Sequence, residues 1–170
     1  PQFSSTGQRL EDSSAEANDP DGPPLTFTPE INELEPNSFR QAGARIGKFE
    51  FQSGAAQSLS NDFPIFRYGD ALLMKAEVEW RLGNPGAALN FVNQVRARAG
   101  VDPLSALDAD ILLAERGREL FAEGWRRSDL IRFGKYGDAW WEKGPSDDFR
   151  ALFPIPQQQI DANPDLTQNP

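Results

Sequence analysis

The sequence predicts an all-α fold in which helical hairpins follow a long irregular segment. Apolar residues recur at helical spacing from residue 70 to residue 133. The short turn Gly83-Asn84-Pro85 joins two of these stretches, so they must pack antiparallel. Residues 1–62, by contrast, are rich in Pro, Gly, Ser, Asn and Asp, which favour turns. We therefore expect a loop-rich segment, 1–62, that packs on a helical body, 63–170.

The composition restricts the function as well as the fold. The 170-residue chain has a net charge of −9, which disfavours binding to the polyanionic backbone of nucleic acid. It has no histidine and no cysteine, which excludes Ser-His-Asp and Cys-His catalysis and the usual imidazole or thiolate zinc sites. We expect no catalytic residue, no metal and no cofactor. The chain begins at Pro1 without a methionine, and we interpret it as a piece of a longer protein.

The predicted hairpin consists of two helices of similar length. The first covers about residues 70–82 and ends at Gly83, a typical C-terminal cap. Its apolar face is formed by Leu72, Leu73, Ala76 and Trp80. Asn84 suits an N-cap and Pro85 a first helical turn, so the second helix starts there and runs to about residue 99. Its apolar face is formed by Ala88, Val92, Val95 and Ala99.

A third helix is expected from about Asp108 to Glu123, with Ser105 or Asp108 as its N-cap. Its apolar face is formed by Leu113, Gly117, Leu120, Phe121 and Gly124. Glycines on such a face let a neighbouring backbone approach, although each costs roughly 1 kcal/mol in helix propensity.

The C-terminal part is expected to be mostly irregular. A short helix covers 125–133, a loop covers 136–152, and 157–162 forms one last helical turn. Phe153-Pro154-Ile155-Pro156 must be extended, because proline disfavours helix in the residue before it. We expect this segment to be a buried strap that crosses the helices.

The charge pattern of residues 115–133 exceeds what an amphipathic helix needs. Glu115, Glu119 and Glu123 form one row in a helix, where like charges repel by roughly 0.2–0.5 kcal/mol per pair. We expect the arginines that follow to fold back and neutralise this row. The predicted ion-pair network consists of Glu115, Arg116, Glu119, Glu123, Arg126, Asp129 and Arg132.

Two other interpretations of these carboxylates remain open, a metal site and a carboxylate pair for glycoside hydrolysis. Hydrolysis needs two carboxyl groups roughly 5–10 Å apart, and one of them needs a raised pKa. Neighbouring arginines favour the ionised form instead. For the network, we expect that Glu119→Ala costs roughly 3 kcal/mol or more if Glu119 is buried.

Four tryptophans are candidates for packing or for binding. Trp80 and Trp125 lie on helix faces or junctions and are expected in the core. Trp140 and Trp141 lie in a loop between Gly137 and Gly144. They could fill a gap between helices, or they could contact a ligand, because exposed aromatic side chains on loops can bind the apolar faces of sugar rings.

Several segments resemble known proteins in order and spacing. Residues 70–100 resemble a tetratricopeptide-type hairpin. Residues 61–77 and 89–100 are similar to the C-terminal region of the SusD/RagB family, and so are the charged segment 115–133 and the ending 153–170. This resemblance covers about residues 28–170.

The resemblance implies a binder rather than an enzyme. Members of this family are helical lipoproteins on the outer face of the outer membrane. They capture a glycan or other nutrient and act as a lid on a SusC-type TonB-dependent transporter. It also implies a missing N-terminal half and a lipid-bearing cysteine upstream. Because the sugar-contacting aromatic residues of the family lie mainly upstream, no ligand contact carries over to this chain.

Two other functions remain open. A helical protein-interaction scaffold would share the hairpin but would show further repeats at about 34-residue spacing. An all-helical glycoside hydrolase would place a carboxylate in an apolar cleft beside aromatic side chains.

Overall fold

The computed structural model describes residues 7, 11–12, 25–39, 41–44, 46–49 and 62–170. The chain divides into two compact units, Pro1–Ser60 and Asn61–Pro170. The prediction that segment 1–62 packs on the helical body stays a prediction.

The described part of the first unit is nearly without regular structure. Strand β1 (Glu11–Asp12) pairs antiparallel with β2 (Leu25–Thr26), each two residues long. Phe27 is buried, and the Asn32 side chain holds a bend by donating to the Asn37 carbonyl and accepting from the Phe39 N–H. The described residues of this unit therefore agree with the irregular N-terminal segment that the composition predicts.

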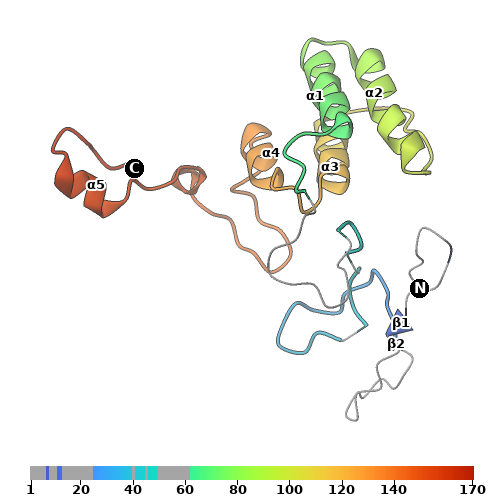
Figure 1. The fold of residues 1–170 in the computed structure, drawn as a ribbon, viewed down its shortest axis with the longest axis horizontal. Helices are drawn as coiled ribbons and strands as arrows, with labels where there is room; N and C mark the ends of the chain where they lie inside the picture. The colour runs from blue at the N-terminus through green and yellow to red at the C-terminus, as the bar shows by residue number, and fades with distance from the viewer. Residues whose placement is uncertain (1–6, 8–10, 13–24, 40, 45, 50–61) are drawn as a thin grey trace. The chain divides into compact units, whose positions relative to one another are not determined.

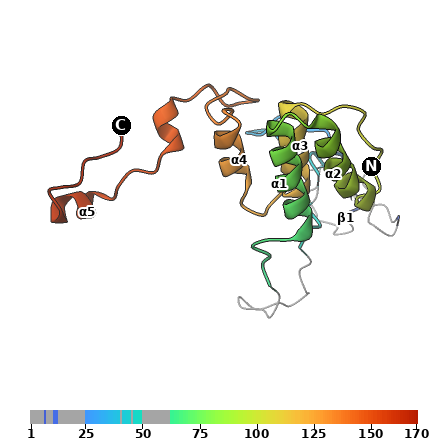
Figure 2. The same ribbon diagram turned by 90° about the horizontal axis from the view of Figure 1, so that it is seen from above.

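The second unit begins with the predicted hairpin. Helix α1 (Tyr68–Arg81) and helix α2 (Pro85–Arg98) lie antiparallel and side by side (Figures 1 and 2). Gly83 has a φ of +82°, a left-handed conformation that suits glycine, and the N–H of Asn84 donates to the Glu79 carbonyl. Asn84 occupies the N-cap position of α2, but its side chain donates to Glu79 instead of capping the helix.

Helix α3 (Ala109–Glu119) packs on both α1 and α2, and helix α4 (Arg126–Arg132) packs on α3. The side chain of Asp108 caps α3 by accepting from the Ile111 N–H at 2.7 Å. The buried core consists of Leu73, Ala76, Val92, Val95, Leu112 and Leu120. Trp80 and Trp125 pack against this core, as predicted. Phe121 and Ala99 are exposed, contrary to the predicted apolar faces.

Helix α3 ends at Glu119, four residues earlier than predicted. The carbonyl of Glu119 accepts a hydrogen bond from the guanidinium of Arg67, so it is already occupied at the helix end. The N–H of Glu123 donates to Leu120 in a turn, and Ala122 adopts a φ of +61°. A side chain from another part of the chain therefore satisfies the orphan carbonyl that a helix end leaves.

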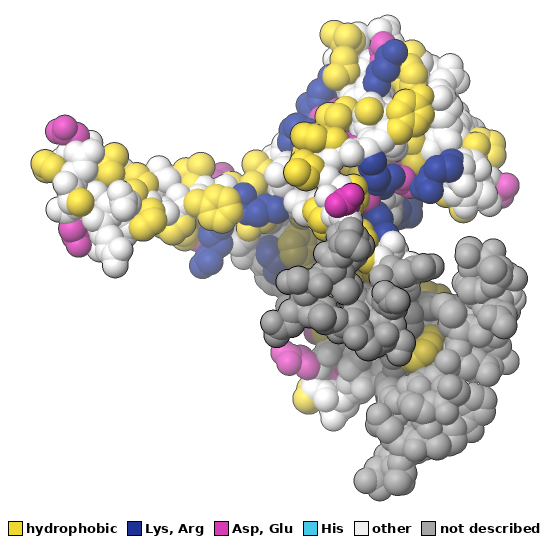
Figure 3. Space-filling view, in the orientation of Figure 1, with side chains coloured by type: hydrophobic (Ala, Val, Ile, Leu, Met, Phe, Trp, Pro, Cys, Tyr) yellow, Lys and Arg dark blue, Asp and Glu magenta, His cyan; other side chains and the backbone are white. Residues whose placement is uncertain are grey.

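The C-terminal part contains two short helical elements, the 3-10 helix η1 (Asp148–Ala151) and helix α5 (Gln157–Ala162). Between them, the segment 153–156 is extended, as predicted, but the expectation that it is buried is wrong. Phe153 is 73% exposed, and apolar side chains lie on the surface of this part of the chain (Figure 3). The C-terminal residues hold the segment instead: Gln168 bonds both backbone groups of Ile155, and Asn169 donates to the Phe153 carbonyl.

Among the described helices, none is long and apolar enough to cross a membrane.

Candidate functional site

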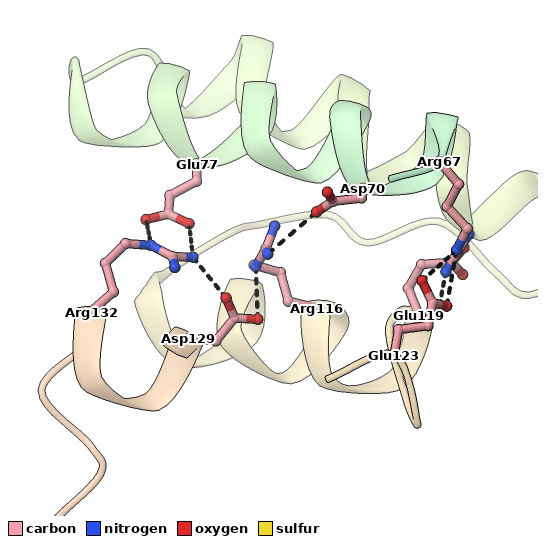
Figure 4. A network of polar contacts seen from close by, with 8 residues as sticks. All are labelled: Arg67, Asp70, Glu77, Arg116, Glu119, Glu123, Asp129 and Arg132. Atoms are coloured by element: carbon pink, nitrogen blue, oxygen red, sulfur yellow. Dashed lines mark hydrogen bonds and ion pairs between the residues drawn. The ribbon is translucent and has the colours of Figure 1, made fainter. Parts of the chain in front are cut away.

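A buried arginine occupies the centre of the helical unit. Arg116 on α3 is 1% exposed, and its Nε donates to Asp129 on α4 at 2.9 Å. Its Nη2 lies 3.4 Å from an oxygen of Asp70 on α1, so one guanidinium connects three helices (Figure 4). Both carboxylates are 1% exposed. A charge this deeply buried is retained only when opposite charges and hydrogen bonds surround it.

A second arginine closes the other side of this cluster. Arg132 on α4 donates two hydrogen bonds to Glu77 on α1, at 2.8 and 2.7 Å, and one to Asp129 at 2.9 Å. Hydrogen bonding to Glu77 raises the pKa of Arg132 above its usual value. Burial raises the pKa of Glu77, but hydrogen bonds from Arg132 and Arg81 outweigh it, so the pKa of Glu77 lies below its usual value. The ionised form of Glu77 is therefore favoured.

The residue that precedes α1 holds the far end of α3. Arg67 donates to both oxygens of Glu123, at 2.9 and 2.8 Å, and to Glu119 at 2.5 Å. The hydrogen bonds to Glu123 raise the pKa of Arg67. The Arg67–Glu119 pair lies against Gly69, where an added Cβ would meet the Arg67 side chain at 2.6 Å and the Glu119 side chain at 2.8 Å. A glycine at position 69 therefore makes room for the ion pair.

Helix α2 supplies two further arginines. Arg96 lies 2.9 Å from Glu115, which also accepts from Arg118 one turn along α3. Arg98 donates to both oxygens of Glu119 at 2.8 Å. The row formed by Glu115, Glu119 and Glu123 is thus neutralised mainly by arginines of α2 and by Arg67.

The predicted partners of these glutamates are therefore partly wrong. Among the described residues, Arg126 donates to the Leu113 carbonyl at 2.9 Å and lies over Gly117, rather than pairing with a carboxylate. Arg127 donates to the Ala151 carbonyl and lies over the ring of Phe153. Both arginines therefore bind backbone carbonyl groups.

Sequence reasoning missed the partners that lie outside 115–133. The carboxylate partners of Arg67 lie 52 and 56 residues further along the chain. The positions of Asp70 and Glu77, however, could have predicted a buried ion pair. They lie on the same helical face as Leu73 and Ala76, and acidic residues on an apolar face need a buried cation.

The carboxylates of the cluster are all paired with arginines. Each lies within ion-pair distance of at least one guanidinium, as shown for Asp70, Glu77, Glu115, Glu119, Glu123 and Asp129. Among the described residues, no group of three or more carboxylates is arranged to hold a metal ion. The arrangement is suited to fixing the relative positions of helices.

The tryptophan pair lies outside this cluster. Trp140 and Trp141 are each 50% exposed, so the interpretation that they fill a gap between helices is wrong for the described part of the chain. They belong to a tight turn in which the backbones of Trp140 and Lys143 exchange two hydrogen bonds, at 3.1 and 2.9 Å. The turn holds two large aromatic surfaces at the protein surface.

We expect Glu77→Gln to flatten the dependence of stability on pH. The pKa of Glu77 is lower in the folded chain than in the unfolded chain. Its contribution to stability is therefore complete above the unfolded pKa, about 4.3, and is lost as the pH falls through the folded pKa. Urea unfolding at a series of pH values should show a steeper acid loss for the wild type than for Glu77→Gln.

Glu79→Gln, on the same helix, is the matched control for this experiment. Its side chain accepts from Asn84 and takes no part in the arginine cluster. Equal acid losses for the wild type and for Glu77→Gln would contradict the role of the Glu77–Arg132 pair.

The fold and the cluster define a class of protein: an all-α, tetratricopeptide-like scaffold braced by arginine–carboxylate pairs. Comparison with known sequences then identifies the family. The sequence model of the SusD family matches residues 36–149, and the chain belongs to this family. The match covers the charged segment but not the extended strap or the C-terminal residues.

Individual relatives support the same assignment. The chain is 34% identical over 118 residues to the starch-binding protein SusD of Bacteroides thetaiotaomicron. The aligned region covers 64% of this chain and 21% of that protein. It is 32% identical over 138 residues to the SusD-like protein P38 of Formosa agariphila. This aligned region covers 74% of this chain and 27% of that protein. The chain thus spans about a quarter of the length of these relatives.

A solved structure shows the same fold. The surface glycan-binding protein A of Bacteroides uniformis matches with a TM-score of 0.55 and 30% identity. The match covers 64% of this chain and 28% of that one.

Proposed function

We propose that this chain is part of a cell-surface protein that captures a glycan or other nutrient and passes it to a SusC-type TonB-dependent transporter. The observation that carries the proposal is membership of the SusD family, together with relatives named as starch-binding and surface glycan-binding proteins. The same family membership supports a location on the outer face of the outer membrane. A lipid anchor on a cysteine upstream of this chain belongs to the proposal too.

Within this function, the helical unit acts as a frame. Ion pairs join α1, α2, α3 and α4. The network residues of 115–133 therefore have a structural role in this proposal. Trp140 and Trp141 are the candidate ligand contacts, since both are half-exposed on one turn.

The proposal also holds that the protein binds without cleaving. A glycoside hydrolase needs a protonated carboxylic acid at neutral pH. The lowered pKa of Glu77 favours the opposite, ionised state of that carboxyl group.

A glycan microarray, combined with a reducing-sugar assay on the same ligands, tests this proposal in the whole protein that carries this chain. We expect binding to at least one glycan without release of reducing ends. Turnover would support a hydrolase instead. The absence of both binding and turnover would favour a protein-interaction scaffold.

Exposure at the cell surface is tested separately. Protease added to intact cells should digest the protein while a periplasmic marker stays whole. Digestion only after the outer membrane has been permeabilised would contradict the proposed location.

A further inference from the structure

The loop 137–146 is a closed unit whose two ends are bonded to each other. The N–H of Ser146 donates to the Gly137 carbonyl at 2.9 Å. Gly137 lies so close to the other end of the loop that an added Cβ would meet the Ser146 carbonyl oxygen at 2.8 Å. Any other residue at position 137 would force the two ends of the loop apart.

A lysine inside the loop holds its tip. The ammonium group of Lys143 donates to the Asp138 carbonyl at 3.0 Å, to the Gly144 carbonyl at 3.1 Å and to the Ser146 hydroxyl at 3.3 Å. The same group lies over the ring of Trp140, 4.3 Å from the centroid. One ammonium therefore connects the base of the loop to the turn that carries both tryptophans.

The two tryptophans are consequently not equivalent. One face of the Trp140 ring is covered by Lys143. Within the described part of the chain, no ring or cation packs on Trp141, and its side chain is half-exposed. Trp141 presents its ring to solvent from a turn whose backbone is fixed by two hydrogen bonds.

Charge around the tip restricts the ligand. The exposed charged side chains of 138–148 are acidic, namely Asp138, Glu142, Asp147 and Asp148. The cation within this stretch, Lys143, is used for internal hydrogen bonds. A negative surface of this kind repels polyanions and leaves binding of uncharged molecules unaffected.

We propose that loop 137–146 is a preorganised platform on which Trp141 stacks against an uncharged sugar ring, with Gly137 and Lys143 as positioning residues. This inference rests on the proposed function. A rigid loop does not lose conformational freedom on binding, so the whole contact surface contributes to affinity. A sugar ring offers a flat apolar face to an indole, and the acidic rim excludes glycans that carry carboxylate or sulfate groups.

The first test measures direct contact. Calorimetry is carried out with the whole protein and the neutral oligosaccharide that binds best on the array. We expect Trp141→Ala to weaken binding by about tenfold or more, as truncation of an aromatic anchor does. A polygalacturonate fragment of matched length should bind at least about tenfold more weakly than the neutral ligand.

The second test uses two glycines of the same loop. Gly137→Ala introduces the clash with Ser146, whereas Gly144→Ala meets nothing within 4 Å. We expect Gly137→Ala to weaken binding severalfold with an unchanged thermal midpoint, and Gly144→Ala to bind like the wild type.

The role of Lys143 has its own readout. We expect Lys143→Met to weaken binding severalfold and to change the tryptophan fluorescence spectrum, because the cation over Trp140 is lost. Lys143→Arg, which keeps a cation over the ring, should restore much of both.

The possible outcomes separate this inference from the proposed function. If the wild type binds no glycan on the array, both are overturned. If the wild type binds and Trp141→Ala binds equally well, only the platform is overturned. Tighter binding of the polygalacturonate fragment would overturn the assignment to uncharged sugars.

Discussion

Arg116→Met is expected to lower the free energy of unfolding by about 3–5 kcal/mol, the usual cost of removing one partner from a buried ion pair. Methionine fills much of the space that the arginine stem occupied, so the loss arises chiefly from charge. Asp70 and Asp129 would remain 1% exposed without the guanidinium that lies between them. Denaturant titration followed by circular dichroism measures the change directly.

Arg118→Met is the matched control for this experiment. It makes the same substitution on the same helix, but the Arg118 side chain is 58% exposed in its pair with Glu115. An exposed pair of this kind contributes about 0–1 kcal/mol. If the two variants lose the same stability, burial of the Arg116 cluster is not what makes it important.

Glu119→Ala is expected to lower the free energy of unfolding by roughly 3 kcal/mol or more, for the same reason. The Glu119 side chain is 7% exposed, which meets the condition set from the sequence. Its loss leaves Arg67 and Arg98 without a shared carboxylate between the start of α1 and the end of α2. The measurement is again denaturant titration, in the same buffer as the wild type.

A double-mutant cycle with Arg67 isolates the pair from the rest of Glu119. If the contact drives the loss, Arg67→Ala and Glu119→Ala together should cost less than the sum of the two single changes, by about 0.5–3 kcal/mol. Strictly additive losses would mean that Glu119 acts through other contacts. The link between Arg67 and the end of α3 would then depend on Glu123 and on the Glu119 carbonyl.

Local signals predicted the helices well because helix ends are determined by nearby residues. Gly83 adopts the left-handed conformation expected of a C-terminal cap, and Asp108 caps α3 through the Ile111 N–H. The hairpin of α1 and α2 follows from a turn too short for any other arrangement. The end of α3 was predicted four residues late: Ala122 has a φ of +61°, the Glu123 N–H donates to Leu120, and Arg67 binds the Glu119 carbonyl.

The candidate site was only partly predictable. The charged segment 115–133 was recognised as unusual, but most of its partners lie on other helices. Trp140 and Trp141 were recognised as candidate ligand contacts. The role of Lys143 could not be predicted, because its ammonium group donates to backbone carbonyls whose positions depend on the folded loop. The exposure of segment 153–156 was also missed, because an apolar segment is expected to be buried when only its composition is known.

By itself, the sequence determined the all-α class, the antiparallel hairpin and the membership of the SusD family. These features depend on residues a few positions apart, whose preferences act along the chain. Only the tertiary structure decided which carboxylate each arginine binds and which aromatic side chains remain at the surface. Ion pairs and burial join residues as many as 56 positions apart, and no local preference specifies which of several equivalent charges will meet.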